Sequence, residues 1–122
     1  MIGYVTVGTN NLERASAFYD ALLAEIGAKR WMESDQFVAW AVAPDKPSLG
    51  VIKPHDKRPA TWGNGTMVAL VVDSREKVDQ LYKKAIELGA MDEGAAGPRG
   101  EGFYAAYFRD LDGNKLNVFV AG

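Results

Sequence analysis

The first part of the chain carries a strand pattern followed by a helical one. Residues 2–7 are rich in β-branched and aromatic side chains, which favour a strand. Residues 12–26 place apolar side chains at steps of three and four, the spacing of one helix face, and Gly27 is typical of a helix C-terminus. The polar segment before this helix offers N-cap candidates, with Asn10 and Glu13 at the spacing of a capping box.

Three shorter strand patterns follow the helix. They lie at residues 29–33, 37–43 and 49–53, and a turn with two prolines, at 44–47, separates the last two. Residues 54–65 are polar and interrupted by prolines and glycines, which indicates a linker. The order to this point is β-α-β-β-β and then a linker.

The pattern then starts again. Residues 66–72 favour a strand, and a helical pattern follows that Asp73 or Ser74 caps and Gly89 ends. Further strands are predicted near 90–93, 103–109 and 115–120, and the glycine-rich residues 94–102 are interpreted as a flexible hairpin loop, with a lid as its functional version.

The two halves are copies of one unit. Tyr4 lies 63 positions before Met67, and Tyr19 lies 63 positions before Tyr82. Such a period indicates an internal duplication. We therefore predict a single α+β domain over residues 1–122, with module 1 at about 1–53, a linker at 54–65 and module 2 at about 66–122.

Composition excludes several classes of protein. The 122 residues include no cysteine, which excludes disulfides, thiolate catalysis and zinc ribbons. The net charge of -2 gives no argument for nucleic acid or for an anionic membrane. Apolar runs such as 67–72 are too short to span a bilayer, and no signal-peptide pattern is visible, so we expect a cytoplasmic protein.

Three segments carry a family resemblance that spans nearly the whole chain. Residues 11–19 are similar to an Asp-Leu-x-Arg-Ser-x-x-Phe-Tyr helix start, and residues 71–74 to a midpoint motif. Residues 108–114 are similar to a Phe-x-Asp-Pro-Asp-Gly-Asn turn, with Leu111 in place of proline. Together they resemble the vicinal oxygen chelate superfamily, which includes glyoxalase I, extradiol dioxygenases, fosfomycin resistance enzymes and bleomycin resistance proteins.

The resemblance implies a curled mixed-sheet cup with helices on its outer face and a divalent metal inside. Its usual ligands are His on the first strand of each module and Glu or Gln on the last. Here these positions fall on Tyr4, Gly50, Met67 and Asn117. A phenol, a glycine, a thioether and a neutral amide suit such an ion poorly, so we expect no metal and no other cofactor.

Strand alternation identifies a candidate cup wall. The wall mixes apolar and polar side chains, as small-molecule sites do, although half-exposed sheet faces show the same alternation. The register of 103–109 leaves open which of two tyrosines faces the cup, and Arg109 suits either an anionic group or a salt bridge. The candidate ligand-binding residues are Tyr4, Thr6, Trp40, Ile52, Met67, Ala69, Tyr104, Tyr107, Arg109, Asn117 and Phe119.

Other polar motifs are weaker candidates for chemistry. His55, the only histidine, lies in the linker, where a solvent-exposed side chain is expected rather than a general base. The glycines of 94–102 lack the Lys-Ser/Thr of a phosphate loop. Asp110 to Asn114 is explained by turn chemistry better than by a calcium loop. No catalytic residue is identified.

Three candidate functions remain after these exclusions. The first is a metal-free protein that binds a small organic molecule, similar to the bleomycin resistance branch. The alternatives are a metal-dependent lyase or dioxygenase with replaced ligands, and a dimeric interaction module. Whether the chain is an enzyme stays open. The resemblance also implies a homodimer, and no nucleic-acid or membrane partner is expected.

Overall fold

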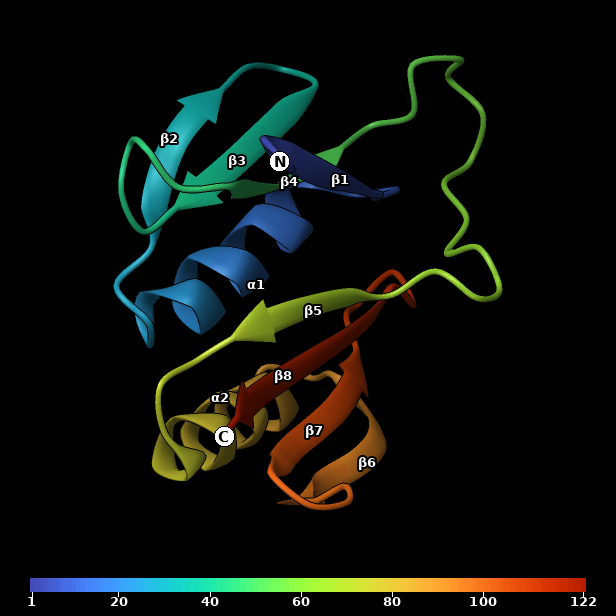
Figure 1. Ribbon diagram of the computed structural model, residues 1–122. Coiled ribbons are helices and arrows are strands. Elements are labelled where there is room, and N and C mark those ends of the chain that lie inside the picture. Colours follow the sequence, from blue (N-terminus) through green and yellow to red (C-terminus); the bar gives the residue numbers. More distant parts are fainter. The chain divides into compact units, whose positions relative to one another are not determined.

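Each half of the chain folds into a four-stranded mixed sheet with one helix against it (Figure 1). The computed structural model describes all residues 1–122. Module 1 contains β1 (Tyr4–Gly8), α1 (Leu12–Ala24), β2 (Lys29–Glu33), β3 (Phe37–Ala41) and β4 (Ser48–Ile52). Module 2 contains β5 (Val68–Val71), α2 (Arg75–Glu87), β6 (Met91–Pro98), β7 (Phe103–Arg109) and β8 (Lys115–Ala121). The predicted α+β fold of two β-α-β-β-β modules is confirmed.

The two sheets repeat one topology. Their strand orders are β1-β4-β3-β2 and β5-β8-β7-β6, and the first strand of each module pairs in parallel with the last. Thr6 pairs with Gly50 in module 1, and Ala69 pairs with Asn117 in module 2. The contacts within the chain divide it into the units Met1–Trp62 and Gly63–Gly122.

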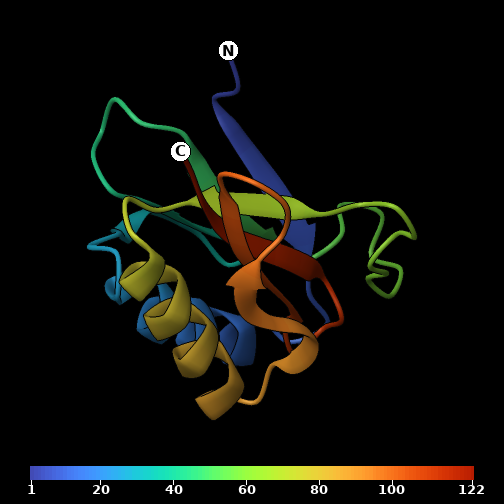
Figure 2. The same cartoon turned by 60° about the horizontal axis from the view of Figure 1, so that its bottom comes forward.

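Each helix covers one face of its own sheet (Figure 2). This arrangement follows from the apolar helix spacing, because the buried side chains of each helix meet the inward side of alternating strands. Module 1 buries Phe18, Tyr19, Leu22, Val38, Trp40 and Val51 in this layer, and module 2 buries Val78, Leu81, Ala85, Phe108, Leu116 and Val118. Neither helix is long and apolar enough to cross a membrane.

The helix caps differ in one respect from the prediction. Asn11 is the N-cap of α1, and its side-chain oxygen accepts from the Arg14 amide at 3.0 Å. The capping box expected from Asn10 is therefore wrong, since the Asn10 side chain instead accepts from the amide of Ala60. In module 2, Ser74 caps α2.

The largest local difference from the prediction lies in the glycine-rich segment 94–102. Strand β6 extends to Pro98, so the loop predicted for 94–102 is reduced to residues 99–102. The pairing of β6 with β7 is irregular around Gly94 and Gly97, because the register shifts on both sides of Gly94. Irregular pairing of this kind interrupts the two-residue alternation by which a strand is recognised in a sequence.

Candidate functional site

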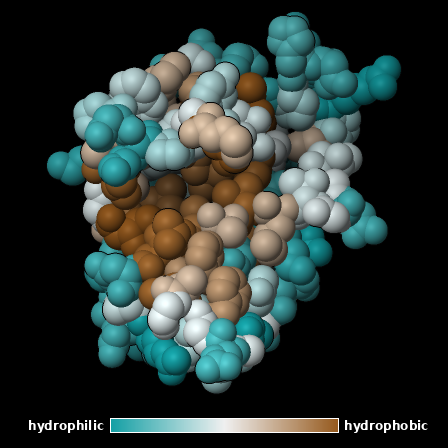
Figure 3. Space-filling model, viewed as in Figure 1, coloured by the Kyte–Doolittle hydropathy of each residue, from teal (hydrophilic) through white to brown (hydrophobic).

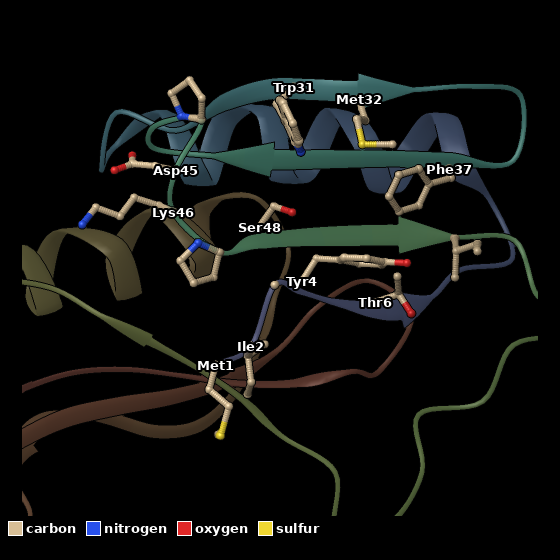
Figure 4. A pocket seen from close by; sticks show the side chains of 14 residues that line it. Met1, Ile2, Tyr4, Thr6, Trp31, Met32, Phe37, Asp45, Lys46 and Ser48 are labelled. Carbon is tan, nitrogen blue, oxygen red and sulfur yellow. The ribbon is translucent and has the colours of Figure 1, made fainter.

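A groove of about 810 Å³ lies on the face of the module 1 sheet opposite α1 (Figure 4). We call it the module 1 groove. Most of its wall is apolar. Figure 3 shows apolar side chains exposed on the side of the protein that faces the viewer. The groove is lined by Met1, Ile2, Gly3, Tyr4, Thr6, Trp31, Met32, Phe37, Pro44, Asp45, Lys46, Pro47, Ser48 and Ile52.

A β-bulge brings two neighbouring large side chains into the groove. Arg30 pairs with Trp40 across the β2–β3 ladder, but the next pair is Met32 with Ala39, so Trp31 is an extra residue. Strict alternation would place only one of Trp31 and Met32 on this face. Because of the bulge both line the groove, with 53% and 50% of their surfaces exposed.

The ring of Phe37 fills the space beside Gly50. A Cβ built on Gly50 would lie 2.6 Å from Cε2 of Phe37, which is shorter than any real contact of that kind. The Phe37 ring also meets Tyr4 edge-on, with ring centres 6.4 Å apart. Gly50 is the position where the resemblance implies a metal-binding carboxylate. Here an aromatic surface takes its place.

A few polar groups stand at the borders of the groove. Thr6 and Ser48 contribute hydroxyls from β1 and β4, and Asp45 and Lys46 lie together in the turn before β4 (Figure 4). Asp45 and Lys46 carry opposite charges. An apolar wall with a few polar groups is typical of sites for small organic molecules.

Three of the module 1 candidates line this groove, and one does not. Tyr4, Thr6 and Ile52 belong to its wall. Trp40 is 2% exposed, and its indole Nε1 donates to Oδ1 of Asp20 on α1 at 2.8 Å. The expectation that Trp40 joins the wall is corrected, because its position in β3 directs it to the helix side.

The Asp20 carboxylate ties Trp40 to a second strand. Arg30 donates to both of its oxygens, at 2.9 and 2.8 Å. The hydrogen bond from Arg30, helped by the one from Trp40, lowers the pKa of Asp20 from its ordinary value despite partial burial. This cluster links α1 to β2 and β3 on the helix side of the sheet.

In module 2 the register separates the two candidate tyrosines. The Tyr104 hydroxyl donates to Asp79 of α2 at 2.7 Å, and the Arg75 guanidinium lies 5.0 Å from its ring centre. The Asp79 hydrogen bond raises the pKa of Tyr104. Tyr107 pairs with Asn117 and points to the other face. The expectation that Tyr104 lines the cup is therefore corrected, because its side chain contacts α2.

The remaining module 2 candidates lie along the face that Tyr107 shares. Asn117 is 2% exposed, and its Nδ2 donates to the carbonyl of Ala106 at 3.1 Å. Phe119 stacks on Phe103 with ring centres 5.2 Å apart. By strand alternation Ala69 shares this side with its partner Asn117. Met67, just before β5, is 43% exposed.

Of the two interpretations of Arg109, an anion-binding group or a salt bridge, the structure supports the salt bridge. Its Nε lies 3.3 Å from a carboxylate oxygen of Glu93, and its Nη1 donates to the carbonyl of Gly113 at 2.9 Å. His55 is exposed in the linker and does not line the module 1 groove.

The four positions implied for a metal do not fit that ion. Gly50 has no side chain and no room for one, and the amide nitrogen of Asn117 is used by its own sheet. Tyr4 and Met67 contribute a phenol and a thioether, which are poor partners for hard divalent ions. No group of three or more His, Cys, Asp or Glu side chains is placed to hold a metal.

Comparison with known proteins agrees with this fold. The family model of the glyoxalase/bleomycin resistance protein/dioxygenase superfamily matches residues 1–118. The chain belongs to this superfamily. A search of curated proteins finds no match.

Solved structures resemble the chain over nearly its full length. A glyoxalase/bleomycin resistance protein from Albidiferax ferrireducens T118 is 33% identical, with a TM-score of 0.89 and coverage of 98% of this chain and 97% of that one. The hypothetical protein SA1046 from S. aureus is 27% identical, with a TM-score of 0.76 and coverage of 99% and 93%. A lactoylglutathione lyase from Agrobacterium tumefaciens shares the fold at 21% identity, with a TM-score of 0.72 and coverage of 98% and 92%.

Proposed function

We propose that this member of the superfamily binds a small, uncharged, largely aromatic molecule in the module 1 groove, without metal catalysis. The observation that carries the proposal is the Phe37 ring beside Gly50. At this position the family resemblance implies a metal-binding carboxylate, and here an apolar ring occupies the space. The groove volume of about 810 Å³ is in the range of small-molecule sites.

The exposed large apolar side chains of the groove support this ligand class. Tyr4, Trp31 and Met32 are each half exposed or more, although burial of such large apolar side chains is favourable. Flat ligands gain both apolar burial and ring contacts from such walls. The hydroxyls of Thr6 and Ser48 supply hydrogen bonds for orientation.

A fluorescence titration with N-phenyl-1-naphthylamine, a neutral aromatic probe, tests the proposal. We expect saturable binding at a 1:1 ratio with a Kd on the order of 100 µM or tighter, given the size of the probe. Trp31→Ala removes a groove side chain and should weaken binding. Val42→Ala is the matched control, since Val42 is 52% exposed on the same module but does not line the groove.

The outcomes separate this proposal from the metal-dependent alternative. Equal affinities for wild type and Trp31→Ala, at unchanged melting temperatures, would contradict binding in the groove. Probe binding or lyase or dioxygenase turnover that requires added zinc, nickel, manganese or iron would favour the enzyme with replaced ligands.

The homodimer is a second proposal, supported by exposed apolar side chains on both modules. Val42 of module 1 is 52% exposed and Val71 of module 2 is 70% exposed, and isolated chains rarely leave many such groups in water. Sedimentation velocity over a range of concentrations should show a dimer. A monomer at all concentrations would contradict this proposal and leave the groove proposal intact.

A further inference from the structure

Two cations approach one tyrosine ring on module 2. The guanidinium carbon of Arg99 and the ammonium of Lys115 each lie 5.6 Å from the centre of the Tyr107 ring. Neither cation forms an ion pair with a carboxylate. Arg109 is different, because Glu93 neutralises it. Two uncompensated positive charges therefore remain around Tyr107.

Backbone carbonyls of β6 hold the Arg99 side chain. Its Nη1 donates to the carbonyl of Gly97 at 3.0 Å, and its Nη2 donates to the carbonyl of Ala95 at 2.7 Å. A Cβ on Gly94 would lie 3.2 Å from Nη2, and a Cβ on Gly97 would lie 3.3 Å from Nη1. The missing side chains thus make room for the guanidinium. Carbonyl oxygens fix its orientation and leave its charge in place.

A pair of aromatic rings lies further along the same face. Tyr107 pairs with Asn117, and two residues further along β8 Phe119 pairs with Ala105. Phe119 stacks on Phe103 at the far end of this row, with ring planes inclined by 22°. By strand alternation these residues share one side of the sheet. The face is therefore cationic at one end and aromatic at the other.

We propose that this face of module 2 binds an organic anion with an apolar body. Its carboxylate lies against Lys115 and Arg99, and its body lies over the Phe119 end of the row. The Lys115 ammonium makes no hydrogen bond within the protein, so its donors are available to the anion. This site belongs to module 2 alone and differs from the module 1 groove in the charge it selects.

Amide-detected NMR with ¹⁵N-labelled protein locates the site directly. The probe is 1-naphthoate, and its uncharged isostere is 1-naphthamide. We expect 1-naphthoate to shift the amide signals of Gly94, Gly97, Tyr107 and Lys115, and 1-naphthamide to leave them unchanged. A shift pattern confined to residues 1–62, or equal binding of the acid and the amide, would overturn the proposal.

Lys115→Met removes the positive charge of the ammonium and keeps a long side chain at this position of β8. Loss of one charge-assisted contact should raise the Kd for 1-naphthoate by at least about tenfold. Lys83→Met removes the same charge from the exposed side of α2 and should leave this Kd unchanged. Equal affinities for Lys115→Met and wild type, at equal melting temperatures, would also overturn the proposal.

Discussion

The Phe37 ring stands where a side chain on Gly50 would have to go, with Cε2 only 2.6 Å from the position of a Cβ. The glycine and the phenylalanine therefore form one arrangement across the β3–β4 ladder. Because the ring borders the module 1 groove, the shape of the groove depends on the absence of that Cβ.

Gly50→Ala should destabilise the protein, because the new methyl group must displace the Phe37 ring. We expect the free energy of unfolding to fall by about 1–3 kcal/mol, the usual cost of overpacking. Urea denaturation measures it. Gly3→Ala is the control, since a Cβ there has nothing within 4 Å.

The same clash predicts a coupling between the two positions. Gly50→Ala should cost less in a Phe37→Ala background, because the obstructing ring is gone. Additive effects of the two substitutions would show that the ring does not oppose a side chain at Gly50.

Trp40→Phe should affect stability without affecting binding in the groove. The substitution removes the hydrogen bond to Asp20 and some buried surface, so we expect a loss of about 1–3 kcal/mol in unfolding free energy. The Kd for N-phenyl-1-naphthylamine should stay at the wild-type value. A higher Kd with little loss of stability would indicate that Trp40 belongs to the groove wall and would contradict its place on the helix side.

Asp20→Asn should lower stability at neutral pH and have a smaller effect in acid. Arg30 lowers the pKa of the folded carboxyl, so its stabilisation is complete above the ordinary pKa of 3.8 and disappears as the pH falls through the folded value. The asparagine keeps an acceptor for Trp40. Since Asp20 is 43% exposed, the difference at pH 7 should be about 1 kcal/mol or less.

Thermal unfolding from pH 7 down to about pH 2 measures this difference, which should shrink below about pH 4. A gap between wild type and Asp20→Asn that stays constant over this range would rule out the ion pair with Arg30 as its cause.

Chelation should leave the fold unchanged. The four implied metal positions offer no fitting ligand set, so EDTA should not lower the melting temperature, and zinc or nickel should not raise it. A ligand that binds only the folded state must raise the melting temperature. A rise with any of these ions would therefore reveal a metal site and contradict our interpretation of Tyr4, Gly50, Met67 and Asn117.

The fold was predictable because the duplication repeats its apolar spacing. The match of Tyr19 with Tyr82 and the glycine after each helix are local features of the sequence. In the structure both tyrosines are buried or partly buried helix residues, and Gly27 and Gly89 have positive φ. The second half of β6, residues 94–98, was missed for the opposite reason. Its glycines favour a loop in isolation, and only pairing with β7 makes them a strand.

The candidate site was predictable only in part. Alternation placed Tyr4 and Thr6 in the groove, but it cannot foresee a bulge, which brings in both Trp31 and Met32. Two adjacent large apolar residues in a charged strand were the available signal. The register of 103–109 stayed open in the sequence, because Tyr104 and Tyr107 are both aromatic. The pairing of β7 with β8 and the hydrogen bond from Tyr104 to Asp79 separate them in the structure.

A groove-blocking variant tests the central claim most directly. Thr6 is exposed and lines the module 1 groove, so Thr6→Trp adds a ring inside the groove without disturbing the helix layer. Val42→Trp adds the same ring outside the groove. With EDTA present, we predict that wild type and Val42→Trp bind N-phenyl-1-naphthylamine and that Thr6→Trp does not. Unchanged binding by Thr6→Trp, or binding by wild type only after a divalent metal is added, would contradict a metal-free ligand site in the module 1 groove.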